Sequence, residues 1–253
     1  MNAHPIPVDR QVDIIDTLLM QSAKFVQIGA GRGIGFTEIM VSAGLGALTV
    51  IDPDTVSREN VGQSGHRISE IGQFKASIAC ARAREINPSV KVENFCCIAS
   101  EVPNLRQVIA GASLLKIGID NPAAQFKIAD LALRAGTSAL VCGTTGDNSQ
   151  WFVAHVAPGG PPLRDLLPEA WRGLQEGYKA PAFFPSCRLH AESLNVQAAR
   201  LALGLIHHQA GSTLPIAEIG AAFTRMPLVI GSNGWHEPSG FLTPACFLSG
   251  SPE

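Results

Sequence analysis

Residues 28–35 read IGAGRGIG, a glycine-rich segment that directly follows a short apolar run. Small residues let the backbone approach a phosphate group, and the first N–H groups of a following helix can donate hydrogen bonds to it. Asp52 ends the next apolar run, where a carboxylate can accept hydrogen bonds from ribose hydroxyls. We therefore predict a nucleotide site in which Gly29, Gly31 and Gly33 lie against the phosphates.

The glycine spacing alone does not distinguish ATP from NAD. The dinucleotide fingerprint has glycine at its first, third and sixth positions. Gly29 and Gly31 fill the first two, but the sixth position is Ile34. A Tyr-x-x-x-Lys pair is excluded, because the single tyrosine, Tyr178, is followed four residues later by Ala182. An oxidoreductase is therefore disfavoured.

Strand-like and helix-like patterns alternate through the first 157 residues. The predicted strands are 25–28, 47–51, 90–95, 114–119, 138–142 and 151–156, and the predicted helices are 36–43, 74–86, 104–110 and 123–134. This rhythm predicts an α/β fold of the Rossmann-like, doubly wound kind, with a mainly parallel sheet and helices on both faces.

The last third of the chain changes character. We expect helices over 164–178 and 189–209, a Pro/Phe loop over 180–186, and a C-terminal antiparallel pair over 227–230 and 241–247. The chain shows neither repeats nor a low-complexity linker, so we predict a single domain over 1–253. Its nucleotide-binding core would be 1–160, followed by a crossover loop, a long helix and terminal strands over 161–253.

The bulk composition is that of an ordinary folded protein, with 19 basic and 21 acidic residues among 253. A lysine/arginine run is absent, which argues against nucleic acid or an anionic membrane as partner. The start of the chain lacks a secretory pattern, and apolar stretches are too short to span a membrane. Six scattered cysteines without a C-x-x-C pair fit free thiols and a cytoplasmic location.

The stretch after Asp52 carries further motifs. They are D-P-D (52–54), V-x-x-x-N (56–60), I-G-x-x-K-A (71–76) before a helix ending I-N-P, and the strand-end pair Asp120-Asn121. Together with the glycine loop, these motifs resemble the ThiF/MoeB family (HesA/MoeB/ThiF), activating enzymes related to the ubiquitin-activating enzyme. The resemblance covers about residues 9–160 and, more loosely, the segment from Cys187 onward.

The resemblance implies an ATP-dependent adenylyltransferase. A carboxylate would attack the α-phosphate of ATP, giving an acyl adenylate and pyrophosphate, with cations stabilising the charge that builds on the phosphate. By resemblance, the carboxylate is the C-terminal glycine of a ubiquitin-like or sulfur-carrier protein, and a peptide or small carboxylic acid is a close variant.

The resemblance also assigns roles to individual residues. Lys75 would contact the phosphates and Asp120 would handle Mg²⁺. Asp52 would hold the ribose, and Asn60 would contact the phosphate or ribose side of the nucleotide. Asp54 either caps a loop or contacts the ligand.

The chain departs from the family at Gln63, where an arginine is usual. Arg32, Arg58 and Arg67 are candidates to supply the lost charge. If none does, the chain would be a nucleotide-binding but weakly catalytic partner subunit. Arg10 resembles the family arginine that reaches into the partner subunit's ATP site, so we expect a homodimer.

The two C-x-x-C pairs of a structural zinc site are missing, so we expect no structural zinc. Cys187 lies before the long helix, where family members that pass the acyl group to a thiol keep a cysteine. A helix start would lower its pKa, and His190 could steady the thiolate. A thioester cysteine and a structural cysteine both remain open interpretations.

Overall fold

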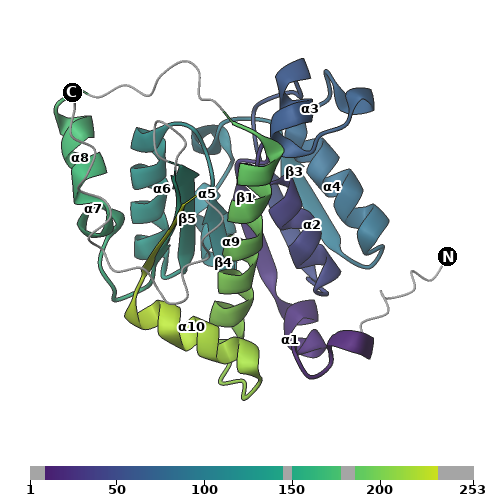
Figure 1. Ribbon diagram of the computed structural model, residues 1–253, viewed down its shortest axis with the longest axis vertical. Coiled ribbons are helices and arrows are strands. Elements are labelled where there is room, and N and C mark those ends of the chain that lie inside the picture. Colours follow the sequence, from purple (N-terminus) through teal and green to yellow (C-terminus); the bar gives the residue numbers. More distant parts are fainter. Residues whose placement is uncertain (1–8, 145–149, 178–185, 233–253) are drawn as a thin grey trace.

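The computed structural model describes residues 9–144, 150–177 and 186–232. Within these ranges the chain forms a seven-stranded sheet of order β3-β2-β1-β4-β5-β6-β7, with helices on both sides (Figure 1). Strands β1 to β5 run parallel to one another, whereas β6 is antiparallel to β5 and β7 is antiparallel to β6. The predicted fold class is confirmed.

The strands lie close to their predicted positions. They are β1 (Lys24–Ile28), β2 (Ala47–Ile51), β3 (Lys91–Phe95), β4 (Leu114–Ile117), β5 (Ala139–Thr144), β6 (Gln150–Val156) and β7 (Leu228–Ser232). Strand β4 ends two residues earlier than predicted, so Gly118 and Ile119 form a connection that leads to Asp120. The predicted strand 241–247 lies outside the described residues, so its pairing with 227–230 stays a prediction; β7 pairs with β6.

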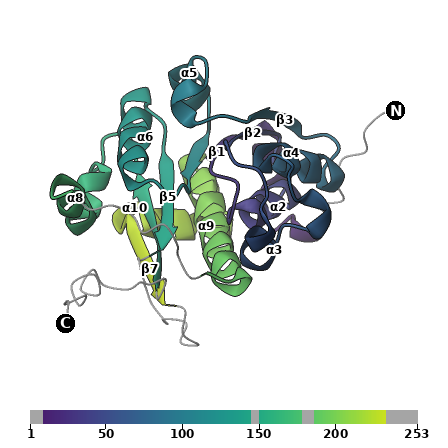
Figure 2. The ribbon, with the colours of Figure 1, turned by 90° about the horizontal axis from the view of Figure 1, so that it is seen from above.

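The helices cover the sheet in two layers. They are α1 (Thr17–Ser22), α2 (Ile34–Ser42), α3 (Arg58–Ser64), α4 (Lys75–Ile86), α5 (Leu105–Ala110), α6 (Pro122–Ala135), α7 (Leu163–Leu166), α8 (Pro168–Gln175), α9 (Arg188–Gln209) and α10 (Pro215–Arg225). Figure 2 shows α5 and α6 on one side of the sheet and α2, α4 and α9 on the other. Each layer has its own buried apolar cluster against the sheet.

The helices differ from the predicted ones in two ways. The helix predicted over 164–178 is interrupted at Leu167, because Pro168 disfavours a helical conformation in the residue before it. Helices α1, α3 and α10 were not predicted. Helix α10 packs closely on α9, where a Cβ added to Gly220 would overlap the carbonyl oxygen of Gly204.

The strand order determines where the predicted site residues meet. Strand β1 lies between β2 and β4 and runs parallel to both. The carboxyl ends of these three strands therefore lie at one edge of the sheet. The glycine loop follows β1, Asp52 follows β2, and Asp120 follows β4. This edge is where parallel sheets of this kind bind ligands. Within the described residues, no helix is long and apolar enough to cross a membrane.

His155 lies in β6 inside the core, with its ring stacked on Phe223 at a centroid distance of 5.5 Å. Its Nε2 has no hydrogen-bond partner among the described residues. Burial lowers the pKa of His155 to about 4. The unfolded chain, with a histidine pKa near the ordinary value, therefore binds the proton more readily than the folded chain.

We expect His155 to lower the free energy of unfolding by about 2 kcal/mol as the pH falls from 7 to 5. This interval lies between the histidine pKa of about 6.5 in the unfolded chain and that of about 4 in the folded chain. His155→Phe should remove this part of the pH dependence. The control is His208→Phe, at an exposed position on α9. Urea unfolding at both pH values measures the effect; equal pH dependence in the wild type and His155→Phe would contradict it.

Candidate functional site

The glycine loop passes directly over the end of β4. Gly29 has φ +94°, a conformation that L side chains rarely adopt, and a Cβ at this residue would overlap the carbonyl oxygen of Gly118. The N–H of Gly29 donates to the carbonyl oxygen of Ile51 at 2.9 Å. Glycine at position 29 therefore brings the loop against both neighbouring strand ends.

Gln27, which is fully buried at the end of β1, holds the loop from beneath. Its Nε2 donates to the carbonyl oxygens of Gly29 and Gly33 at 3.0 and 3.1 Å, while its Oε1 accepts from Thr37 Oγ1 at 2.7 Å. One side chain thus fixes both ends of the loop and the first turn of α2. This role could not be predicted from the sequence, because a single amide in a short apolar strand gives no periodic signal.

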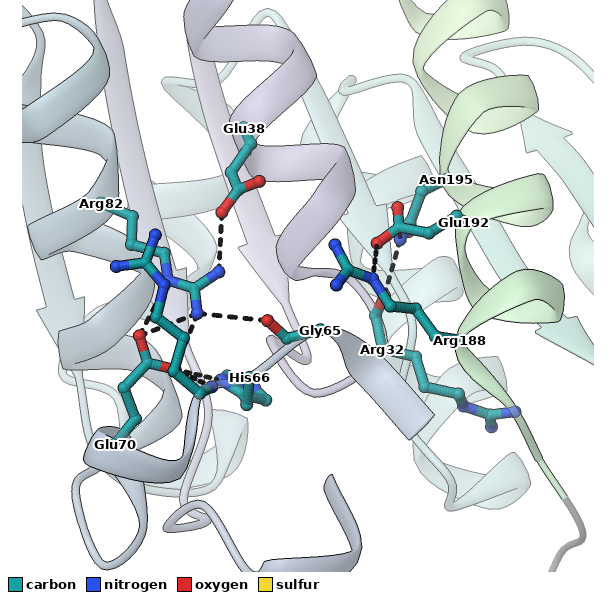
Figure 3. A network of polar contacts seen from close by, with 10 residues as sticks. Arg32, Glu38, Gly65, His66, Glu70, Arg82, Arg188, Glu192 and Asn195 are labelled. Carbon is teal, nitrogen blue, oxygen red and sulfur yellow. Dashed lines mark hydrogen bonds and ion pairs between the residues drawn. The ribbon is translucent and has the colours of Figure 1, made fainter. Parts of the chain in front are cut away.

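Asn195 on α9 holds the loop from the side. Its Nδ2 donates to the carbonyl oxygen of Arg32 at 2.7 Å (Figure 3), and the residue is 2% exposed. A Cβ at Gly35 would overlap Glu192 on the same helix. The long helix of the C-terminal third therefore helps to position the glycine loop. The sequence signal was a lone asparagine in an alanine/leucine-rich helix.

Asp52 holds the loop from the β2 side. Its two carboxylate oxygens accept from the N–H groups of Ala30 and Asp54 at 2.6 and 2.9 Å. Burial raises the pKa of Asp52 above its usual value, and these two hydrogen bonds act in the opposite direction. Asp52 therefore fixes the loop as well as facing the cavity described below.

Lys75 opens α4 and points at the glycine loop. Its Nζ donates to Asp54 Oδ2 at 2.9 Å, and its N–H donates to the carbonyl oxygen of Asp54 at the same distance. A Cβ added to Gly31 would lie 3.7 Å from Lys75 Nζ. The Lys75 side chain is 11% exposed. The ammonium group of Lys75 therefore lies close to the backbone of the glycine loop at Gly31.

These residues surround a cavity of about 670 Å³, here called the loop cavity. Its lining includes Gly29, Gly31, Arg32, Asp52, Asp54, Asn60, Gln63, Lys75 and Asp120, with Cys97, Ile98, Leu105, Ala123 and Ala124 on the apolar side. The structure thus gathers most of the predicted site residues into one cavity. Gly33 instead lines a neighbouring cavity. Their roles towards a ligand remain predictions.

Asn60 lines the loop cavity and also caps α3, since its Oδ1 accepts from the N–H of Ser57 at 3.0 Å. Among the three arginines proposed to replace the charge missing at Gln63, only Arg32 lines this cavity. Its guanidinium forms an ion pair with Asp120 at 3.1 Å. Arg32 is therefore the cation best placed to act beside Lys75.

Asp120 lies at the mouth of the cavity with a largely exposed side chain. Among the described residues, no group of three or more His, Cys, Asp or Glu side chains could hold a metal alone. Mg²⁺ commonly takes only one or two protein carboxylates and completes its shell with phosphates and water. Asp120 therefore fits a magnesium ion that arrives with a phosphorylated ligand.

A buried guanidinium supports the segment that carries Asn60 and Lys75. Arg82 contacts both carboxylate oxygens of Glu70 at 2.7–2.9 Å, Glu38 at 2.7 Å and the carbonyl oxygen of Gly65 at 3.2 Å (Figure 3). His66 Nδ1 lies 3.4 Å from Glu70. Arg82 thereby ties this segment to α4 and α2 beneath the site.

Two predicted catalytic residues lie apart from the loop cavity. Cys187 is exposed at the N-cap of α9 and lines neither cavity. His190 Nδ1 has no hydrogen-bond partner among the described residues, so this nitrogen does not bind the Cys187 thiol. Arg10 is exposed in the short helix η1 (Asp9–Gln11), and it also lines neither cavity.

The model of the ThiF family matches residues 11–232 of this chain. The chain belongs to the ThiF family. Among curated proteins, it is 32% identical over 152 residues to the "SAMP-activating enzyme E1" of Haloferax volcanii, covering 59% of this chain and 55% of that protein. It is 29% identical over 153 residues to the "Adenylyltransferase and sulfurtransferase UBA4" of Candida albicans, covering 59% of this chain and 34% of that one.

Solved structures agree with the fold of this ThiF-family chain. Escherichia coli MccB crystallised with ATP matches with a TM-score of 0.60 at 15% identity, covering 75% of this chain and 57% of MccB. PaaA matches with a TM-score of 0.64 at 17% identity, covering 87% of this chain and 73% of PaaA. The chain spans about a third to a half of the length of the curated relatives it matches.

Gly29→Ala should destabilise the fold strongly, because the added Cβ would meet the backbone of Gly118. Gly136→Ala is the matched control. It has φ +74° at the end of α6, and a Cβ there would meet nothing within 4 Å. We expect the control to cost about 1–2 kcal/mol and Gly29→Ala at least about 2 kcal/mol more. Urea unfolding measures both, and equal losses would refute the close approach of loop and strand.

Proposed function

We propose that this ThiF-family chain is an ATP-dependent adenylyltransferase that activates a carboxylate. The observation that carries the proposal is the position of Lys75 Nζ, beside the backbone of the glycine loop in a cavity that Asp52 and Asp120 also line. The names of the curated relatives, an activating enzyme E1 and adenylyltransferases, support the same activity.

In this proposal the triphosphate of ATP lies along the glycine loop in the loop cavity, where small residues let the phosphates approach the backbone. Lys75 releases Asp54 and binds the phosphate oxygens, and Arg32 releases Asp120 and supplies the charge that Gln63 lacks. Asp52 accepts from the ribose hydroxyls. Asp120 and the phosphates of ATP would hold Mg²⁺, and the ion would neutralise charge on the phosphate oxygens.

The reaction needs little covalent help from the protein. A carboxylate oxygen of the substrate attacks the α-phosphorus, the bond from that phosphorus to the bridging oxygen breaks, and pyrophosphate leaves. Lys75 and Arg32, which line the loop cavity, stabilise the negative charge that develops on the oxygens of the α-phosphate.

We further propose that the carboxylate belongs to the C-terminal glycine of a ubiquitin-like or sulfur-carrier protein, which fits the printed names of the curated relatives. A homodimer, in which Arg10 reaches the site of the partner subunit, completes the proposal. The cytoplasm is the proposed location, since all five cysteines in the described ranges are free thiols.

A second candidate function is a nucleotide-binding subunit that does not adenylate. The Arg32–Asp120 ion pair and the uncharged Gln63 favour it, because both reduce the charge available to a bound phosphate and metal. Exchange of labelled pyrophosphate into ATP distinguishes the two candidates. Exchange that depends on added carboxylate supports the enzyme, and ATP binding without exchange supports the subunit.

Lys75→Met should weaken ATP binding at least about tenfold, because a charge-assisted contact with phosphate is lost. Calorimetric titration with ATP and Mg²⁺ measures the change. Lys91→Met, at an exposed position on the edge strand β3, is the control and should bind like the wild type. Unchanged affinity in Lys75→Met would remove Lys75 from the site.

Cys187→Ala should leave pyrophosphate exchange within about twofold of the wild type and abolish any thioester with the substrate. The test incubates the chain with ATP and a synthetic tail ending in Gly-Gly, followed by intact mass spectrometry without reductant. Cys96→Ala, at a half-buried position after β3, is the control. A thiol-sensitive adduct that persists in Cys187→Ala would assign the role to another cysteine.

A further inference from the structure

Lys116 is a buried cation that the proposed function does not use. It lies within β4, whose four residues are all buried, and it is 3% exposed. Its Nζ lies 4.9 Å from the centre of the Phe36 ring. A Cβ added to Gly33 or to Gly118 would lie 2.6 or 3.2 Å from the same nitrogen. The ammonium group is thus enclosed beside the glycine loop.

Lys116 lacks a counter-ion. Within the part of the chain that the structure describes, its Nζ makes neither an ion pair nor a hydrogen bond. Burial lowers the pKa of Lys116; the neighbouring thiol of Cys142 acts in the opposite direction, and the charge of Arg32 acts in the same direction as burial. Buried charges in proteins are normally paired, because an unpaired one costs several kcal/mol. An apolar residue would suit this strand better.

Lys116 lines a second cavity of about 390 Å³, here called the β5 cavity. Its walls are mostly apolar, with Phe126, Cys142, Phe152, Leu167, Leu174 and Leu194, and its polar lining includes Arg32, Gln125, Thr144 and Asn195. Its two carboxylates are already engaged, Asp120 with Arg32 at 3.1 Å and Glu169 with Arg172 at 2.8 Å. The cavity therefore offers a positive charge that its own lining does not neutralise.

Helix α2 adds to this positive potential. Its N-cap is Gly33, which also lines the β5 cavity, and the N-terminal end of a helix carries partial positive charge. An ammonium group close to this end is repelled by the partial positive charge, unless an anion lies between the ammonium group and the helix. Lys116 Nζ and the start of α2 thus point to the same kind of ligand, a group with negative charge.

The two cavities adjoin each other. Arg32, Gly118, Ile119 and Asp120 line both, whereas Lys116 lines only the β5 cavity. A carboxylate that attacks an α-phosphate in the loop cavity must lie at the shared boundary, beside Arg32. The group that meets Lys116 is therefore a different part of the substrate, further into the β5 cavity.

We propose that the β5 cavity binds the acyl part of the substrate and that Lys116 binds a second carboxylate on it. The proposal rests on the proposed function and names its substrate class, a carboxylic acid with another acidic group within about two residues' length. Two sources share this chemistry: a carrier tail with an acidic residue beside its terminal glycine, and a free dicarboxylic acid. Lys116 would then determine specificity, while Lys75 and Arg32 serve the reacting centre.

Calorimetry on the full chain, with and without the ATP analogue AMPCPP, tests the proposal. One arm compares glutarate with pentanoate, and the other compares the peptides Ala-Glu-Gly and Ala-Gln-Gly with acetylated N-termini. The wild type should bind at least one of the two acidic ligands about tenfold or more tightly than its neutral counterpart. Discrimination in the first arm alone indicates a free diacid, and in the second alone a carrier tail.

Lys116→Met, which keeps the length of the side chain without the charge, should remove this discrimination and leave the neutral ligands within about twofold. Lys91→Met is the control and should discriminate like the wild type. A thermal melt checks the fold of each variant. The wild-type comparison tests the proposal even if Lys116→Met does not fold.

Absence of discrimination in both arms of the wild type, or its persistence in a folded Lys116→Met, overturns the proposal. Titration of ATP with Mg²⁺ in the same samples separates it from the proposed function. ATP binding without acid discrimination refutes the Lys116 site alone. Acid discrimination without ATP binding refutes adenylation and leaves Lys116 as an anion-binding residue.

Discussion

The close approach of the glycine loop to the end of β4 is the constraint on which the rest of the site depends. It requires a residue without a Cβ at position 29 and a backbone in the left-handed region. Three buried polar side chains then hold the loop from different directions: Gln27 from β1, Asp52 from β2 and Asn195 from α9. Each satisfies backbone groups that the loop would otherwise leave unpaired, so the loop keeps one shape before any ligand binds.

Around this loop the chain concentrates positive charge where few protein carboxylates compensate it. Lys75 and Arg32 each have one acidic partner, Asp54 and Asp120, whose side chains are mostly exposed to solvent. Such ion pairs are weak and exchange readily for a phosphate. Lys116 lacks such a partner among the described residues and lies in a separate, mostly apolar cavity. The two cavities thus differ in their lining, and the two proposals give them different ligands: a triphosphate with its ribose in the loop cavity, and an apolar chain with an acidic end in the β5 cavity.

Much of this arrangement could be predicted from the sequence. Alternating strands and helices give a parallel sheet, and the ends of its strands bring Asp52, Asp120 and the glycine loop together wherever the helices lie. The anchoring side chains could not be predicted in this way. Gln27 and Lys116 each interrupt an apolar strand, and a pattern of apolar residues does not show which polar exception faces a cavity. Helix α3 was missed because Gly62 and Ser64 are poor helix formers, although Ser57 and Asn60 pair at its start. Pro168 is itself a sequence signal for the break between α7 and α8.

A crystal structure of the full chain with AMPCPP and Mg²⁺ tests the central claim most directly. The account predicts the triphosphate along residues 29–33, Lys75 Nζ within hydrogen-bond distance of a phosphate oxygen, and Asp120 as a ligand of the metal. A nucleotide bound elsewhere, with Lys75 still paired to Asp54 and Asp120 still paired to Arg32, would contradict it.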